Sequence, residues 1–143
     1  MRIAIASDHA GFALKEKIKE YLFSEGMEVA DLGTYSEDPV DYPVYGKLCA
    51  DAVSAGEADR GIVICATGIG ISIAANKVKG IRCALCADAV AAEMTRKHND
   101  ANMLAIGSKT PAAASAEEIT KAWLYTEFEG GRHKRRTDML DEM

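Results

Sequence analysis

The sequence has no apolar stretch that approaches the roughly 20 residues required for a membrane-spanning helix. A signal peptide is not expected either, because the apolar run Ile3–Ala6 leads directly into Ser7-Asp8-His9. The chain also lacks internal repeats, low-complexity segments and interdomain linkers. We therefore expect one cytoplasmic domain over residues 1–143, with its four cysteines present as reduced thiols.

The sequence also lacks an excess of positive charge. The 143 residues contain 17 Lys and Arg against 22 Asp and Glu, which gives a formal net charge of −5. Nucleic-acid binders carry a basic surface, so that class of protein is not expected. The exception is the short stretch of residues 132–136, in which every residue except His133 is Lys or Arg.

Five short apolar runs alternate with segments whose apolar residues lie three or four positions apart, as in residues 12–22. This alternation predicts an α/β fold with a doubly wound, five-stranded parallel sheet and helices on both faces. After Gly130-Gly131, residues 130–143 are expected to form a basic C-terminal helix. The expected strands are Ile3–Ala6, Met27–Leu32, Gly61–Cys65, Arg82–Cys86 and Met103–Ile106.

Polar side chains follow four of these strands. Ser7-Asp8-His9 ends the first strand, and Asp41-Tyr42-Pro43 follows the second after a loop at Ser36–Pro39. Cys65 ends the third strand, and Asp88 follows the fourth. Ligands of doubly wound folds bind beyond the carboxyl ends of the strands, so we expect the functional site there.

The stretch Cys65-Ala66-Thr67-Gly68-Ile69-Gly70 predicts a tight turn between a strand and a helix, because apolar residues follow it at helical spacing. Such a turn exposes backbone N–H groups at the positive end of a helix dipole. A thiol beside them ionises more readily, and the N–H groups can hold an oxyanion. Together they indicate acid–base or nucleophilic chemistry on a carbonyl compound.

The other cysteines are interpreted as inert. Cys83 and Cys86 form a C-x-x-C pair, but their spacing in a strand places the two sulfurs on opposite faces of the sheet. No second such pair and no nearby pair of histidines is present, so a zinc site is not expected. Cys49 lies in a predicted helix over residues 45–53 and is expected to be buried.

The residues around Cys65 can be compared with two familiar motifs. A cysteine phosphatase loop needs arginine six residues after the nucleophile, where this chain has Ile71, so that reading fails. A dinucleotide fingerprint would use Gly68 and Gly70, with Asp88 as the ribose-binding acid. It lacks the third small residue, follows the third strand and has no substrate domain. It stays as an alternative.

Several polar residues also have a purely structural interpretation. Asp8 suits the N-cap of the first helix, which would leave His9 merely exposed. His98 ends a helix after two basic residues, where cations interact favourably with the helix dipole. Asn99 and Asn102 fit helix-end and turn positions. For Arg132 and Arg136 the alternative is a solvated face, yet their i, i+4 spacing also suits a phosphate dianion.

The combination resembles the type B ribose-5-phosphate isomerases, which are grouped with galactose-6-phosphate isomerase subunits, along essentially the full chain. This resemblance implies a Rossmann-like fold and an aldose–ketose isomerase that uses neither metal nor organic cofactor. It also implies a homodimer or a dimer of dimers with active sites between subunits. The matching stretches are Ser7–Gly11, Asp41–Pro43, Cys65–Gly70, Ala74–Lys77, His98–Asn102 and Gly130–His133.

The resemblance assigns abstraction of the C2 proton of the sugar to Cys65. Thr67 would hydrogen-bond to Cys65 or to the substrate. Backbone N–H groups would stabilise the enediolate oxygens, and glycines allow that close approach. The residues expected to supply this backbone are Ala66, Gly68, Ile69 and Gly70.

The resemblance makes His98 the ring-opening residue, with Asn99 binding a substrate oxygen. Asp8 would hold sugar hydroxyls, and Asp41 and Tyr42 would line the same pocket. The segment that contains His98 and Asn99, like the C-terminal arginines, is expected to reach across from the partner chain.

For the phosphate the resemblance implies a clamp of His9, Arg132 and Arg136. Lys109 stands where some members carry arginine and would offer a point charge to the phosphate. The residue after the cysteine is commonly glycine, but here it is Ala66, which keeps its N–H.

The expected reaction interconverts D-ribose 5-phosphate and D-ribulose 5-phosphate, a step of the pentose phosphate pathway. Two alternatives stay open: isomerisation of a hexose 6-phosphate such as allose or galactose 6-phosphate, and a non-catalytic subunit that binds sugar phosphates. The expected partner is a phosphorylated sugar, with no nucleic acid and no membrane.

Overall fold

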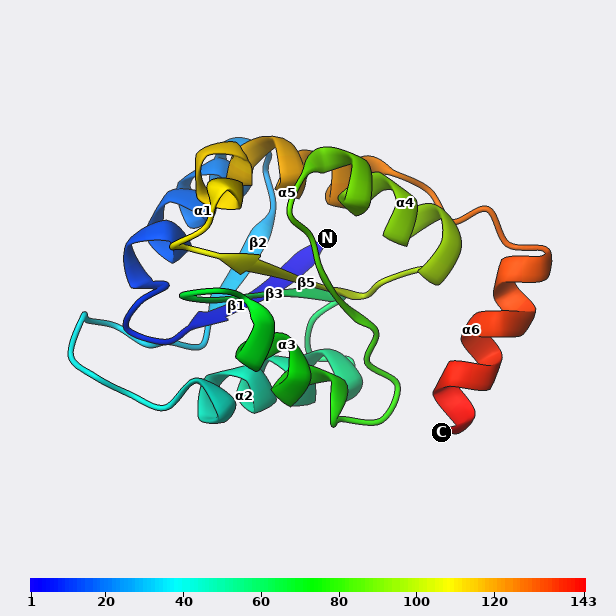
Figure 1. The fold of residues 1–143 in the computed structure, drawn as a ribbon, viewed down its shortest axis with the longest axis horizontal. Helices are drawn as coiled ribbons and strands as arrows, with labels where there is room; N and C mark the ends of the chain where they lie inside the picture. Colours follow the sequence, from blue (N-terminus) through cyan, green and yellow to red (C-terminus); the bar gives the residue numbers. More distant parts are fainter.

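A computed structural model describes all of residues 1–143 (Figure 1). Its centre is a five-stranded, all-parallel sheet with the strand order β2-β1-β3-β5-β4. The predicted sheet is therefore confirmed. Its strands are β1 (Arg2–Ser7), β2 (Glu28–Asp31), β3 (Arg60–Cys65), β4 (Cys83–Leu85) and β5 (Met103–Gly107).

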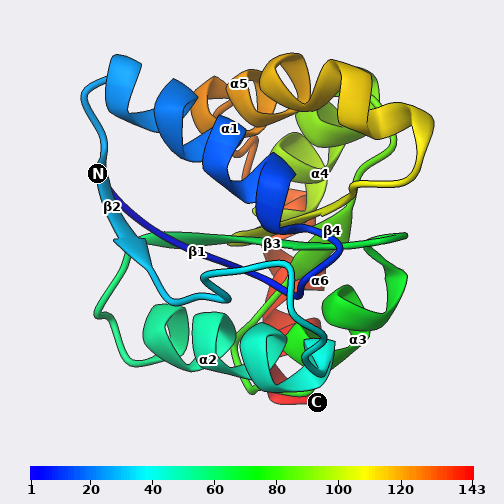
Figure 2. The same ribbon diagram turned by 90° about the vertical axis from the view of Figure 1, so that its left-hand side faces the viewer.

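Helices cover both faces of the sheet, as Figure 2 shows most clearly. One face carries α1 (Phe12–Ser24), α4 (Ala89–Asn99) and α5 (Ala116–Tyr125), and the other carries α2 (Tyr42–Ser54) and α3 (Ile69–Asn76). A short 3₁₀ helix, η1 (Pro111–Ser115), precedes α5. The predicted basic helix is α6 (Arg132–Glu142), which lies beside α4 at one end of the molecule (Figure 1). None of these helices is both long and apolar enough to cross a membrane.

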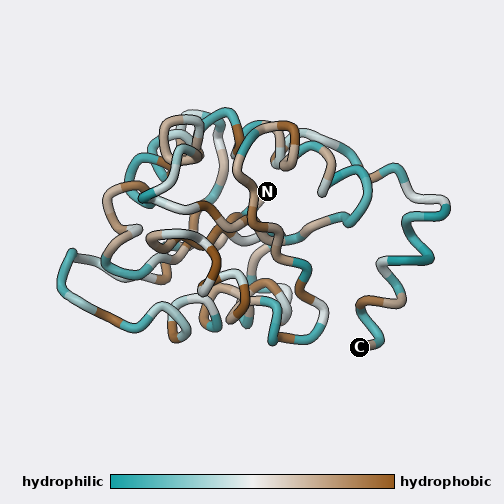
Figure 3. Tube along the Cα trace, in the orientation of Figure 1, coloured by the Kyte–Doolittle hydropathy of each residue, from teal (hydrophilic) through white to brown (hydrophobic).

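Alternate residues of the central strands supply two separate cores. Ile62 and Ile64 of β3 point toward α1, α4 and α5, where Trp123 is fully buried. Val63 and Cys65 of the same strand point toward α2 and α3. Both faces of the strands are therefore apolar, as expected for a parallel sheet between helices. Figure 3 shows apolar residues along the strands and mostly polar residues along α6.

The strand order reverses at the centre of the sheet. The chain leaves β1 toward β2 on one side and then crosses to β3 on the other side of β1. The carboxyl ends of β1 and β3 therefore lie side by side, with Ser7 opposite Ile64. Such a reversal leaves an open crevice at the strand ends, which is where ligands of doubly wound folds bind.

The edge strands are shorter than the sequence predicted. Arg82 and Cys86 lie just outside β4, which pairs with β5 alone. The Arg82 N–H donates to the side chain of Asn102 at 2.8 Å instead of to a strand. The predicted separation of the two sulfurs is nevertheless confirmed, since Cys86 belongs to one core and Cys83 packs against the other.

Candidate active site

The turn after β3 has the predicted strand–turn–helix geometry. β3 ends at Cys65, Gly68 is the N-cap of α3 with a φ of 75°, and the helix begins at Ile69. A side chain at Gly68 would be strained by this φ, and its Cβ would lie 2.6 Å from Cδ1 of Leu85. The glycine therefore lets the loop lie directly over the end of the sheet.

Hydrogen bonds within this turn leave several donors free. The Gly68 N–H donates to Sγ of Cys65 at 3.2 Å, and the Ile69 N–H donates to Oγ1 of Thr67 at 3.2 Å. The N–H groups of Ala66, Thr67 and Gly70 donate no hydrogen bond within the chain. Free amides at a helix N-terminus form an anion-binding arrangement. Cys65 itself is only 5% exposed and lies directly beneath this turn.

Asp8 and His9 follow β1, also at the carboxyl ends of the strands. The Asp8 N–H donates to the carbonyl of Ile64 at 3.2 Å, which places Asp8 next to the end of β3. Asp8 is 6% exposed, and its Oδ1 accepts the Gly11 N–H at 3.1 Å. The interpretation of Asp8 as an N-cap is wrong, because α1 starts only at Phe12 after Gly11.

His9 is also more constrained than the structural interpretation held. The ring is half-buried, and its Nδ1 lies 3.1 Å from the backbone nitrogen of Val40. This contact fixes the ring against the loop after β2 and leaves Nε2 for a ligand. The exposed Asp41 at the end of that loop is the N-cap of α2 and makes no capping hydrogen bond with its side chain.

Tyr42 and Lys109 lie close to the turn. A Cβ on Gly70 would lie 2.5 Å from the Tyr42 ring, so the aromatic ring rests on this glycine. The Lys109 N–H donates to the carbonyl of Ala66 at 2.8 Å, which holds the loop after β5 against the turn. The structure therefore brings together one group at the carboxyl ends of the strands, called here the thiol cluster. Its members are Asp8, His9, Asp41, Tyr42, Cys65, Ala66, Thr67, Gly68, Ile69, Gly70 and Lys109.

The remaining predicted residues lie elsewhere. α4 runs back toward the amino ends of the strands, so His98 and Asn99 in its last turn reach the opposite end of the sheet (Figure 1). Arg132 and Arg136 lie exposed on α6, beside that end of α4. Within one chain, these four residues do not join the thiol cluster. They are called the arginine cluster below.

The side chain of Arg82 links the two helices that carry the arginine cluster. Its guanidinium donates to the carbonyl of Asn99 at 2.9 Å and to Oδ1 of Asp141 at 2.6 Å. One side chain thus connects the end of α4 with α6. A hollow of about 510 Å³ beside it is lined by Arg82, Asn99 and Leu140, among others.

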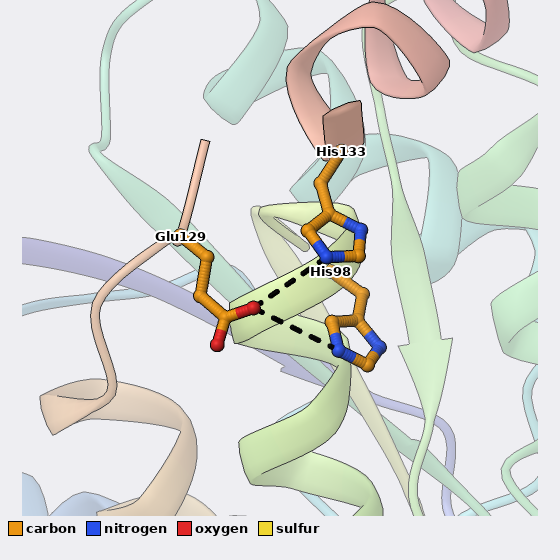
Figure 4. A group of neighbouring side chains, drawn as sticks. All are labelled: His98, Glu129 and His133. Carbon is orange, nitrogen blue, oxygen red and sulfur yellow. Dashed lines mark ion pairs between the residues drawn. The ribbon is translucent and has the colours of Figure 1, made fainter. Parts of the chain in front are cut away.

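Two residues that the sequence analysis did not assign complete this region (Figure 4). The rings of His98 and His133 stack with centroids 4.4 Å apart and planes 16° apart. Oε1 of Glu129 lies 3.5 Å from Nε2 of His133 and 4.0 Å from Nε2 of His98. Desolvation lowers the pKa of His133, and His98 and Arg132 lower it further, whereas Glu129 raises it. The i, i+4 spacing of Glu129 and His133 was the available sequence signal.

The residue types of this trio are those of a zinc site, but their arrangement is not. An imidazole binds a metal in the plane of its ring, about 2 Å from the nitrogen. The ring planes of His98 and His133 are nearly parallel, with centroids 4.4 Å apart, so one ion cannot lie in both planes. The rings would have to turn before they could share a metal.

The other three cysteines lie in the two cores or pack against them. Burial raises the pKa of Cys49 to about 12 and that of Cys86 to about 11. Cys83 is half-buried and its pKa is raised for the same reason. All four thiols are free. Among the four, Cys65 is the thiol whose sulfur accepts a hydrogen bond from a backbone N–H of its own turn.

Comparisons with known proteins agree with one another. The model of the family Ribose/Galactose Isomerase matches residues 3–140. Ribose-5-phosphate isomerase B of Escherichia coli K12 is 48% identical over 139 residues, 97% of this chain and 93% of that protein.

Solved structures give the same result. Clostridium thermocellum ribose-5-phosphate isomerase B matches with a TM-score of 0.97 and 51% identity over 99% of this chain and 96% of that one. Mycoplasma genitalium ribose-5-phosphate isomerase B, solved with bound ribulose-5-phosphate, matches with a TM-score of 0.93 and 41% identity over 99% and 94%.

Proposed function

The chain belongs to the Ribose/Galactose Isomerase family, and from that premise we propose that it interconverts D-ribose 5-phosphate and D-ribulose 5-phosphate. The observation that carries the proposal is the turn at Cys65, where a thiol lies beside unbonded amides at the reversal point of the sheet. This arrangement offers a base and an oxyanion site at the same place.

Cys65 is the proposed base. Its thiolate removes the proton from C2 of the open-chain aldose, and the electron pair moves through a C1–C2 double bond onto the carbonyl oxygen. The N–H groups of Ala66, Thr67 and Gly70 hold the enediolate oxygens, while the Gly68 N–H holds the thiolate sulfur. A proton passes from the C2 hydroxyl to the C1 oxygen, and the thiol returns the first proton to C1. The product is the ketose, with no net change in protons.

Other members of the thiol cluster bind the sugar. The Asp8 carboxylate lies next to the end of β3 and accepts hydrogen bonds from the sugar hydroxyl groups near C2 and C3. Tyr42 rests on Gly70 and forms a wall of the pocket together with Asp41. Nε2 of His9 and the ammonium of Lys109 are available to the phosphate.

The arginine cluster completes the site from a second chain. His98 opens the furanose ring, Asn99 binds a sugar oxygen, and Arg132 and Arg136 bind the phosphate. Because these residues and Cys65 lie at opposite ends of one sheet, one chain cannot apply both to one sugar. We therefore propose a homodimer, or a dimer of such dimers, in which segment 130–143 contacts the partner.

Exposed apolar residues around the edge strand β4 support such an assembly. They come from α3 and β4, which contact each other, and from α4, which follows β4 in the chain. Exposed apolar surface commonly marks a protein–protein contact. These residues are Ile69, Ile73, Leu85, Val90 and Met94.

The proposal further places the enzyme in pentose phosphate metabolism in the cytoplasm, without nucleic acid, membrane, metal or organic cofactor.

The first experiment measures turnover of D-ribose 5-phosphate by the wild-type chain and by Cys65→Ala. We expect Cys65→Ala to lose isomerisation by at least 100-fold, the lower range for removal of a general base, while it still binds the sugar phosphate. Cys83→Ala is the matched control, because it removes a thiol outside the thiol cluster. Near-normal turnover of Cys65→Ala would show that the base lies elsewhere.

The same assay separates the alternatives. The family description includes galactose, so allose 6-phosphate and galactose 6-phosphate are assayed beside the pentose. A higher kcat/KM for a hexose phosphate would replace the pentose in the proposal. A non-catalytic binding subunit would bring no solvent deuterium into any of these sugars.

A further inference from the structure

Glu129 occupies a defined place beside His98. Its backbone N–H donates to the carbonyl of Lys97 at 3.2 Å, so the segment before α6 is anchored to the last turn of α4. Its side chain lies beside the stacked pair and faces the edges of both rings, with Oε1 3.5 Å from Nε2 of His133 and 4.0 Å from Nε2 of His98 (Figure 4). The mechanism above gives this carboxylate no role.

Both rings turn the same nitrogen toward that carboxylate. His133 is 6% exposed, and its Nε2 has no hydrogen-bond partner, since 3.5 Å to Glu129 is a long contact. The stacked ring of His98 is held parallel to it. A carboxylate that faces one imidazole nitrogen favours the tautomer with the proton on that nitrogen. For His98 this leaves Nδ1 as the nitrogen that exchanges a proton with the sugar.

The charges around His133 are mostly positive. Arg132, Arg136 and the ring of His98 lower the pKa of His133, and Glu129 acts in the opposite direction. The Lys97 ammonium adds a further positive charge near Glu129, although it is paired with Glu93. Glu129 is the acidic group that approaches both rings, and its charge opposes these effects.

We propose that Glu129 is a positioning residue for ring opening, which holds His98 as the Nε2–H tautomer. The inference rests on the proposed function of the same site. In the ring-opening step, protonated Nδ1 of His98 gives its proton to the ring oxygen as the C1–O bond breaks. The C1 hydroxyl loses its proton to solvent, so the step needs no further reactant.

The chemistry of the two sugars makes this role separable from that of Cys65. D-ribose 5-phosphate is a furanose in solution and must be opened. In D-ribulose 5-phosphate the oxygen on C5 carries the phosphate, so no five-membered ring can close onto C2. Exchange of a C1 hydrogen of the ketose with solvent therefore needs the enediolate step at Cys65 but no ring opening.

The test compares Glu129→Gln with Glu127→Gln. Glu127 is an exposed carboxylate two residues earlier, and it is absent from both clusters. We expect Glu129→Gln to lower kcat for D-ribose 5-phosphate about tenfold, part of the roughly 100-fold or more typical of general acid–base catalysis. Deuterium exchange into C1 of D-ribulose 5-phosphate should stay within about twofold of wild type, and Glu127→Gln should change neither rate.

A second measurement reports the tautomer itself. Nitrogen-15 NMR of the wild-type chain should show His98 protonated at Nε2, and Glu129→Gln should shift this signal toward a tautomer mixture. Equal loss of turnover and exchange in Glu129→Gln, unchanged turnover, or an Nδ1–H tautomer in the wild type would each overturn the inference. A wild-type chain that does not convert D-ribose 5-phosphate would instead overturn the proposed function.

Discussion

At the scale of single residues, Arg132 and Arg136 of α6 differ from the cations that are paired within the chain. Lys134 on the same helix pairs with Asp138, and Lys47 on α2 pairs with Asp51. Arg132 and Arg136 are exposed and form no ion pair within the chain. Their guanidinium groups are therefore free to bind an external anion, and the i, i+4 spacing lets both reach the same one.

This placement predicts the effect of Arg132→Ala. Removal of one charge-assisted phosphate contact should raise KM for the sugar phosphate about tenfold, since such contacts contribute about 1.5–3 kcal/mol. Because the phosphate is bound equally in the ground and transition states, kcat should change much less. Steady-state kinetics of Arg132→Ala and of its neighbour Arg135→Ala provide the measurement and the control. An unchanged KM would show that Arg132 is a solvated surface residue and does not bind the phosphate.

The residues of the thiol cluster were largely predictable from sequence, because a strand end fixes their place locally. Cys65 and Gly68 needed only the strand–turn–helix pattern, and their geometry follows from it. The pairing of Glu129 with His98 was not predictable. It joins residues 31 positions apart in sequence, and it depends on how the segment before α6 returns to α4.

At the scale of elements, local pattern located all five strands but not their ends. A central strand such as β3 pairs on both sides, so its full apolar run is held in the sheet. β4 pairs on one side only, and its register with β5 covers just Cys83–Leu85, although the Cys86 N–H still donates to the carbonyl of Ala105 at 3.2 Å. The parallel sheet with helices on both faces followed from the alternation of strands and helices. The order of the strands within the sheet depended on packing, which one sequence does not display.

α1 and β2 are joined by a buried ion pair. Nζ of Lys15 lies 2.7 Å from Asp31, and the Lys15 side chain is fully buried, whereas that of Asp31 is 18% exposed. Lys19 also donates to Asp31 at 2.7 Å. Burial acts to raise the pKa of Asp31, but the hydrogen bonds from Lys15 and Lys19 outweigh it, so the pKa is lowered.

We therefore predict that Asp31→Asn destabilises the fold by about 3 kcal/mol at pH 7, the lower range for breaking a buried pair. A lowered pKa contributes stability above the unfolded value, near 3.8, and this contribution is lost as the pH falls through the lower folded value. Urea denaturation at pH 7 and below pH 3.8 should show the difference from wild type shrinking in acid.

The exposed pair of Lys47 and Asp51 supplies the control for that experiment. Both side chains are about half exposed or more, at 67% and 47%. Asp51→Asn should change the free energy of unfolding by less than about 1 kcal/mol. Equal effects of Asp31→Asn and Asp51→Asn would contradict the argument from burial.

At the scale of the whole molecule, the sheet itself separates the two halves of the proposed site. The strands are parallel, so all their carboxyl ends lie at the same end of the sheet, together with the thiol cluster. Each covering helix runs back in the opposite direction, so α4 finishes at the amino ends of the strands. No side-chain rotation bridges that distance, so the fold requires a second copy if His98 and Cys65 act on one sugar.

A mixing experiment tests this requirement. Cys65→Ala and His98→Ala chains are each expected to be nearly inactive. When equal amounts are refolded together, half of the dimers should be mixed, and one of the two sites in each mixed dimer has both intact residues. Activity should therefore recover to about a quarter of wild type. Cys65→Ala refolded with Asp8→Ala is the matched control, because both changes lie in the thiol cluster and every mixed site keeps a defect. Recovery in the control pair, or none in the first pair, would contradict a site shared between chains.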